Sequence, residues 1–190
     1  MFQSLRGHFL ISAKHLRDSN FYKSVVLLLE HNSDGSMGVV INWPMALKVS
    51  SALEKHFEIP DSPVCLYCGG PVEESALLIL HNSPDYDQEF GGILPNLFVG
   101  TSPDVFEKMA ASMRDEDSEF RFRIFAGYSG WSGGQLESEL NRGDWHTLPA
   151  SSEYVFRAEP YEIWEDALRE FQAKTSILPT PPKPQSSEWN

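Results

Sequence analysis

The sequence predicts one α+β domain built on a mixed, largely antiparallel sheet. Three observations support this class. The chain has 190 residues, 41% of them hydrophobic, which is enough for a single core. Its apolar runs are short, strand-sized and separated by glycine- and proline-containing turns. Predicted hairpins alternate with amphipathic helices, without the regular strand–helix–strand rhythm of a parallel sheet.

The first third of the chain predicts an antiparallel hairpin. A short strand over 8–12 comes first. The run SVVLLLE at 24–30 is continuously apolar, as in a strand buried on both faces. The turn sequence HNSDGS separates it from a second strand at 37–42. The Asp34-Gly35 pair suits a tight turn, so these two strands are predicted to pair directly.

The middle of the chain predicts a helix followed by three strands. The helix is expected over 45–57, where Leu53 and Phe57 share one face. Two strands, 64–68 and 76–81, are predicted to form a second pair, and a short strand follows at 97–100.

The last third predicts two strands and three helices. Ser102-Pro103-Asp104 combines a capping side chain, proline at the first helical position and an acid near the helix N-terminus. A half-buried strand follows at 120–125, then a helix over 134–142 and a strand over 154–157. A helix over 161–171 places its apolar residues on one face.

We expect residues 1–174 to form the domain and 175–190, rich in proline and serine, to be a disordered tail. A PxxP ligand within 179–184 is the alternative reading of that tail. No run approaches the roughly 18 apolar residues of a membrane helix. The N-terminus also lacks the apolar stretch and cleavage site of a signal peptide, so a cytoplasmic location is expected.

The formal charge of −12 is unevenly distributed along the chain. Residues 1–60 contain 6 basic and 5 acidic residues, whereas 115–170 contain 5 and 13. Such a field repels phosphate backbones and makes nucleic acid an unfavourable partner. Two readings of the acidic surface stay open: a solvated face that favours solubility, or a face that docks a basic partner.

Cys65 and Cys68 form a CxxC motif, but in the wrong setting for redox chemistry. A thioredoxin-type pair lies at a helix N-terminus, whereas these residues fall on a predicted strand. A zinc site needs further ligands at suitable spacing, and the six histidines supply no such pair. No metal and no cofactor are therefore predicted.

The segment Gly130-Trp131-Ser132-Gly133-Gly134 matches G-x-S-x-G and lies between a predicted strand and a predicted helix. Three readings compete. Ser132 can be the nucleophile of a hydrolase. It can instead cap the helix, with Gln135 completing a capping box. The exposed backbone N–H groups can also bind an anion. We favour the capping role, because His146 with Asp144 lies too near in sequence for the usual hydrolase arrangement.

Two histidines at predicted strand ends are candidates for acid–base chemistry. Glu30 and His31 end the first strand of the hairpin, and His81 ends a later strand. A carboxylate beside a histidine is what such chemistry uses. Turn hydrogen bonding is the alternative role, and the sequence leaves open whether the two ends meet.

Three blocks together resemble one family of bacterial proteins. GHFLIS…LRDSNFYKSVVLLLEHNSDGSMGVVINWP, CGGPVEESALLILHN and GYSGWSGGQLESEL…GDWHTLPAS resemble the YqgE/AlgH family in order and spacing. The resemblance implies a compact fold with a bifurcated, partly barrel-like sheet surrounded by helices, in a cytosolic bacterial protein. Two prolines of the family pattern are missing near Ala13 and Asp18, and Ser129 replaces an alanine.

The resemblance implies little about activity. Members carry the label of transcriptional regulators, but this chain has no visible DNA-binding motif. The matching positions define a candidate ligand-binding set and no catalytic residues. The set consists of Glu30, His31, Asn42, Gly69, Gly70, His81, Trp131, Gln135 and Glu137.

We therefore expect a non-catalytic binding or regulatory protein that acts through a protein partner or a small ligand. The alternative is a small hydrolase that uses Ser132 or a Glu30/His31/His81 group. Direct DNA binding is the least favoured function.

Overall fold

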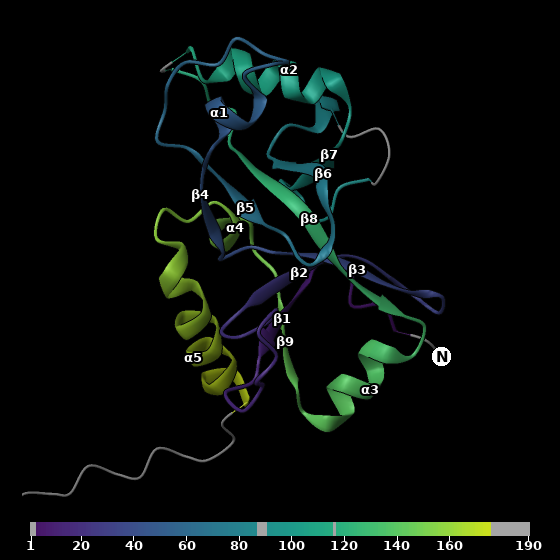
Figure 1. Ribbon diagram of the computed structural model, residues 1–190. Helices are drawn as coiled ribbons and strands as arrows, with labels where there is room; N and C mark the ends of the chain where they lie inside the picture. The colour runs from purple at the N-terminus through teal and green to yellow at the C-terminus, as the bar shows by residue number, and fades with distance from the viewer. Residues whose placement is uncertain (1–2, 87–90, 116, 176–190) are drawn as a thin grey trace, which may run out of the picture.

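A long strand, β8 (Phe122–Ser132), runs through the molecule and joins its two halves (Figure 1). The computed structural model describes residues 3–86, 91–115 and 117–175. The first part of β8 lies between β5 (Cys65–Cys68) and β6 (Val72–His81). The last part pairs with β3 (Gly35–Val40). β8 therefore belongs to both halves of the sheet.

The described residues form one nine-stranded sheet in the order β4-β5-β8-β3-β2-β1-β9, with β6 branching from β8 and β7 pairing with β6. The β5–β8 pair is parallel, and the other pairs between these strands are antiparallel. The predicted mixed, largely antiparallel sheet is thus confirmed; it branches and is not closed into a barrel. The remaining strands are β1 (His8–Ser12), β2 (Val25–Asn32), β4 (Pro44–Lys48), β7 (Phe98–Gly100) and β9 (Trp145–Pro149).

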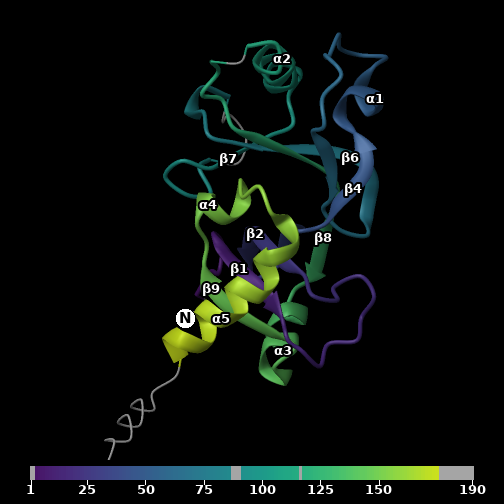
Figure 2. The same cartoon turned by 90° about the vertical axis from the view of Figure 1, so that its left-hand side faces the viewer.

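Helices cover both halves (Figures 1 and 2). In one half, α1 (Val49–Leu53) and α2 (Pro103–Ser112) pack their apolar residues against β6 and β8. In the other half, α5 (Ile163–Thr175) contacts β1, β2 and β9, while α3 (Gln135–Arg142) contacts β3, β8 and β9. The other helical segments are α4 (Ser152–Val155) and the 3-10 turns η1 (Pro84–Tyr86) and η2 (Pro160–Glu162).

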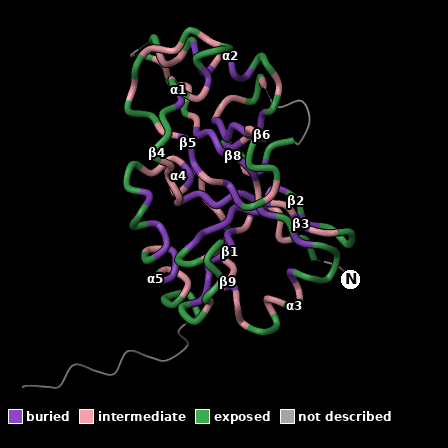
Figure 3. Tube along the Cα trace, viewed as in Figure 1, coloured by how far each residue is buried: buried purple, intermediate pink, exposed green. Residues whose placement is uncertain are grey.

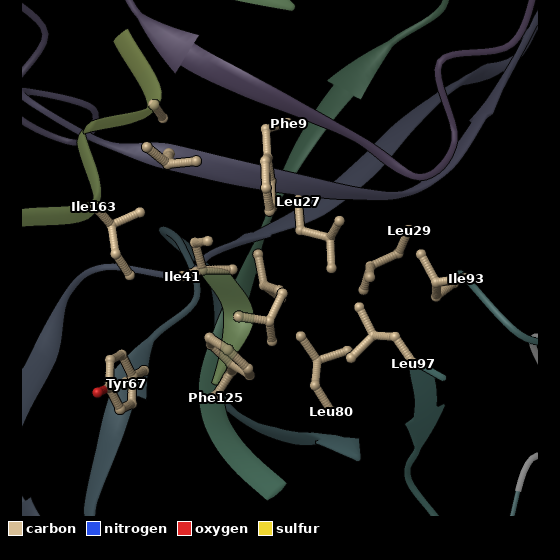
Figure 4. Packing of buried hydrophobic residues seen from close by; sticks show 14 of the residues in the cluster. Phe9, Leu27, Leu29, Ile41, Tyr67, Leu80, Ile93, Leu97, Phe125 and Ile163 are labelled. Carbon is tan, nitrogen blue, oxygen red and sulfur yellow. The ribbon is translucent and has the colours of Figure 1, made fainter. Parts of the chain in front are cut away.

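Among the described residues, three groups of buried side chains form the core, which follows the sheet through both halves (Figure 3). The largest lies between the sheet and the α4–α5 segment, where Phe9, Leu27, Leu80 and Phe125 converge (Figure 4). The second lies beneath α1 and α2, and the third beneath α3. In the described part of the chain, no helix has the length and apolar character needed to cross a membrane.

Several predicted elements are confirmed. β2 and β3 form the antiparallel hairpin, whose turn is stabilised by the Asn32 side chain accepting the N–H groups of Asp34 and Gly35. Helices begin at Pro103, Gln135 and Ile163, close to the predicted positions.

Three predictions of local structure are wrong. The predicted helix over 45–57 is split, because 44–48 pairs with β5 as an edge strand and only 49–53 is helical. The predicted strand over 154–157 is instead the short helix α4, whose Val155 is buried in the largest core group beside residues of α5. The strands at 64–68 and 76–81 do not pair with each other, because β8 lies between them.

β9 was not predicted from the sequence. It pairs with β1 along its whole length. The predicted tail lies at 175–190, and 176–190 are outside the described residues.

Candidate functional site

A set of hydrogen-bonded side chains from four elements holds helix α3 against the end of the sheet. We call this set the α3 polar cluster. Its members are His31 of β2, Trp131 and Ser132 of β8, Gln135, Glu137 and Glu139 of α3, and Trp145 of β9. The first and third motif blocks of the sequence therefore meet in space.

His31 links the N-terminal segment to α3. Its Nδ1 accepts the backbone N–H of Leu5 at 2.7 Å, so the ring proton lies on Nε2. Nε2 donates to Oε1 of Glu137 at 2.9 Å. The His31 side chain is only 2% exposed. Both ring nitrogens are thus used inside the fold, and neither is directed at a substrate.

Glu137 is the partly exposed partner in this pair, with 40% of its side chain accessible. A hydrogen bond from its own backbone N–H lowers the pKa of the Glu137 carboxyl below 4.5, and the hydrogen bond from His31 adds to this effect. The carboxylate is therefore ionised at neutral pH and accepts a hydrogen bond from the Nε2–H group of His31.

Glu139 accepts two indole N–H groups with a single oxygen. Its Oε2 lies 2.9 Å from Nε1 of Trp131 and 2.8 Å from Nε1 of Trp145. The two indoles meet edge to face at 6.0 Å and are 5% and 3% exposed. Buried indole donors need a partner, and this carboxylate supplies it to both. Trp131 is therefore a core residue, not an exposed platform for a ligand.

Gln135 extends the cluster to the end of β8. Its Nε2 donates to Oε1 of Glu139 at 3.0 Å, and its Oε1 accepts the backbone N–H of Ser132 at 3.1 Å. The Ser132 hydroxyl also donates to this oxygen at 3.2 Å. One half of the predicted capping box, from Gln135 to the backbone of Ser132, is present.

The predicted capping by the Ser132 side chain is wrong. The N-cap residue of α3 is Gly134, in the left-handed conformation at φ 78°, and it makes no side-chain cap. Ser132 is still part of β8, and the chain turns into the helix at the left-handed Gly134.

Ser132 also lacks the arrangement of a nucleophile. A serine nucleophile needs a general base within about 2.6–3.2 Å. The Ser132 hydroxyl instead donates to an amide oxygen, and His31 is engaged by Leu5 and Glu137.

Asn42 organises the start of β2. Its Oδ1 accepts the N–H of Val25 at 2.8 Å and its Nδ2 donates to the carbonyl of Lys23 at 2.9 Å. The residue is 4% exposed. The Asn42 amide is needed to accept one backbone hydrogen bond and donate another, and this structural role involves no ligand.

Gly69 and Gly70 lie where β5 passes β8. A Cβ on Gly69 would lie 2.2 Å from the carbonyl oxygen of Gly127, and one on Gly70 would lie 2.3 Å from Oγ of Ser129. These glycines allow two backbones to pass closely, so the second motif block is a strand crossing.

The structure does not bring His81 to the other candidates. His81 is fully buried in the opposite half of the molecule, stacked between Phe98 and Phe120 at 5.9 and 5.7 Å. His81 pairs with Phe122 at the start of β8. His31 pairs with Ser36 of β3, and Ser36 pairs in turn with Trp131 near the end of β8. These positions on β8 are nine residues apart, about 30 Å of extended strand. The Glu30/His31/His81 group is therefore not assembled, and Glu30 is exposed at a bulge of β2.

A surface hollow of about 720 Å³ lies between α4 and α5, away from the α3 polar cluster. Its charges are internally paired: Asp166 binds Arg157 and Arg169, and Glu170 accepts the Tyr154 hydroxyl at 2.9 Å. Burial, followed by the hydrogen bond to Glu170, raises the pKa of Tyr154 to about 12. Tyr154 is thus a neutral donor at physiological pH.

Metal ligation finds no support among the described residues, which contain no group of three or more His, Cys, Asp or Glu side chains able to hold an ion. Cys65 and Cys68 are at the two ends of β5, so the predicted strand is confirmed here, and both are free thiols in the structure. Three residues of extended chain separate their Cα atoms by about 10 Å. A disulfide requires less than about 7 Å.

The comparison with known proteins identifies the family. The profile described as DUF179, AlgH-like, matches residues 9–176. This chain belongs to the AlgH-like family. It is 39% identical to a UPF0301 protein of Chlorobaculum tepidum over 86% of this chain and 84% of the relative. It is 37% identical to a UPF0301 protein of Sodalis glossinidius over 87% and 91%, respectively.

Two solved structures share the fold of this chain. The solution structure of the AlgH protein from Pseudomonas aeruginosa matches 95% of this chain and 100% of that protein, with 34% identity and a TM-score of 0.70. The crystal structure of protein DIP2367 from Corynebacterium diphtheriae covers 95% and 90%, respectively, with 22% identity and a TM-score of 0.71, which supports the fold alone.

Two residues of the α3 polar cluster, Glu139 and Trp145, were not among the candidates identified from the sequence. Glu139 lies eight residues after Trp131 and six before Trp145. An acid in a short helix between two tryptophans was the available signal. Its meaning depends on β9, which had not been predicted.

Proposed function

We propose that this AlgH-like protein is a non-catalytic binding or regulatory protein that acts in the cytoplasm through contacts with a protein partner or a small ligand. One observation carries the proposal: the polar side chains that catalysis would use are engaged in hydrogen bonds that hold α3 to the sheet. His31, Gln135 and Glu139 each have their polar atoms committed in this way.

The test is to purify the tagged, full-length protein gently from the bacterium that produces it and to analyse the associated proteins and small molecules by mass spectrometry. An unrelated tagged protein of similar net charge controls for capture by the −12 charge alone. We expect a partner or metabolite in near-stoichiometric amount that is absent from the control. A chain that carries nothing, together with turnover of a substrate, would contradict the proposal.

A hydrolase that uses Ser132 is the second candidate. It is favoured by the exposed position of Ser132 between a strand and a helix, as in a nucleophile elbow. The test measures covalent labelling of the native chain and of the Ser132→Ala variant by a fluorophosphonate probe. We expect no labelling of either protein. Labelling of the native chain that disappears in the variant would establish the hydrolase instead.

Direct DNA binding is the third and least favoured candidate. The net charge of −12 opposes the phosphate contacts that supply most nucleic-acid affinity. We expect no gel shift of duplex DNA at physiological ionic strength. A salt-sensitive shift under these conditions would restore this candidate.

A further inference from the structure

A partly apolar hollow of about 460 Å³ opens on the half of the molecule formed by α1 and α2. Phe57, Ile59 and Pro60 line it and are only half-buried. The Phe57 ring stacks on Phe106 of α2 at 6.2 Å and 12°, so the core fixes its position. The hollow therefore presents preformed apolar surface to solvent.

The rim of the hollow is polar. The half-buried Ser50 and the exposed Glu54, Glu58 and Arg114 complete the lining. Among the described residues, the Glu54 and Glu58 carboxylates take part in none of the ion pairs. Arg114 is engaged, because its guanidinium donates to the backbone carbonyl of Glu58. Two carboxylates are thus available at the edge of an apolar surface.

Acidic residues outnumber basic ones in this half of the molecule. Its described residues, 44–86, 91–115 and 117–127, contain 11 acidic and 6 basic residues, a net charge of −5. Such a field attracts cationic partners and repels anionic ones. A second copy of this chain, with the same charge, is an unfavourable occupant.

We infer that the hollow between α1 and α2 docks a basic segment of a partner protein, with apolar side chains placed on Phe57 and Ile59 and basic side chains paired with Glu54 and Glu58. The inference rests on the proposed binding function and names the chemistry of the partner. The apolar contacts supply affinity, and the surrounding acidic charge selects against acidic segments.

The experiment titrates the isotope-labelled full-length protein with a synthetic amphipathic peptide of leucine and lysine, followed by amide chemical shifts. A peptide of leucine and glutamate with the same pattern is the charge control. We expect the leucine–lysine peptide to shift signals in 50–60 and at Arg114. Affinity should fall about tenfold in the double variant Glu54→Lys/Glu58→Lys, because the rim charges reverse.

The matched control variant is Glu153→Lys/Glu162→Lys, which makes the same charge change on the other half of the molecule. We expect it to bind the leucine–lysine peptide within about twofold of the native chain. All four substituted glutamates are exposed, so both variants should retain the native spectrum.

Equal binding of both peptides, shifts confined to another surface, or no binding at peptide concentrations of about 1 mM would overturn the inference. These results leave the proposed function intact if native purification yields a partner. Failure to purify any partner bears on the proposed function itself, so the two failures are distinguishable.

Discussion

Glu139 shows how a residue can resemble a functional group and yet stabilise the fold. Its carboxylate lies among aromatic rings, as a ligand-binding group would, but both of its oxygens are occupied by protein donors. His31 is similar, since each ring nitrogen has a partner from the same chain. At the scale of the residue, the polar character of these positions follows from buried donors that need acceptors.

Replacing Glu139 with alanine should destabilise the protein by about 3 kcal/mol, because two buried indole N–H groups lose their acceptor. Urea unfolding followed by tryptophan fluorescence measures the change. The control is Glu165→Ala, which removes a surface ion pair with Lys23 and should cost less than about 0.5 kcal/mol. A cost below about 1 kcal/mol for the Glu139 variant would show that water replaces the carboxylate easily.

Glu137 should contribute a pH-dependent part of the stability. Its folded pKa lies below 4.5, so its stabilisation is complete above pH 4.5 and is lost as the pH falls through the folded pKa. We expect the difference in unfolding free energy between the native chain and Glu137→Gln to be constant above about pH 5 and to shrink in more acidic solution. Urea titrations from neutral to acidic pH test this expectation. A difference in unfolding free energy between the two proteins that stays constant over the whole pH range would contradict this expectation.

At the scale of the element, glycines serve two different purposes. Gly134 supplies a left-handed turn into α3, and a Cβ there would meet no other atom within 4 Å. Gly69 lies at the β5–β8 crossing, where a Cβ would collide with the backbone of Gly127. The first glycine is required by its backbone conformation and the second by lack of space.

Gly134→Ala should therefore cost about 1 kcal/mol, the price of a left-handed alanine. Gly69→Ala should cost more than about 3 kcal/mol or prevent folding, because two strands must separate. Urea midpoints and the yield of folded protein distinguish the two variants. Similar costs at both sites would mean that the crossing relaxes more readily than its distances imply.

The sequence predicted elements whose signals are local. The apolar run of β2, the proline start of α2 and the apolar face of α5 each depend on neighbouring residues, and each was found. β4 and β9 are edge strands whose conformation depends on partners far along the chain, β5 and β1. For the same reason the sequence suggested His31, Trp131, Gln135 and Glu137 but could not separate a ligand site from an internal network.

At the scale of the whole molecule, the shared strand β8 should make the two halves unfold together. The four tryptophans in the described part of the chain, Trp43, Trp131, Trp145 and Trp164, pack in the core clusters of the half that contains α3 and α5. Changes in the fluorescence of these four residues report on that half, whereas far-UV circular dichroism reports on the entire fold. We expect coincident urea transitions from the two signals. Separate midpoints would show that the halves are independent units.

A double-mutant cycle between Glu139 and Trp145 tests most directly whether the motif residues serve the fold. Trp145→Phe keeps an aromatic ring but removes the indole N–H that donates to Glu139 at 2.8 Å. The unfolding free energies of the native chain, Trp145→Phe, Glu139→Ala and the double variant should give a coupling of about 1–2 kcal/mol. A coupling near zero would contradict the structural role of the α3 polar cluster and would return these residues to the search for a ligand.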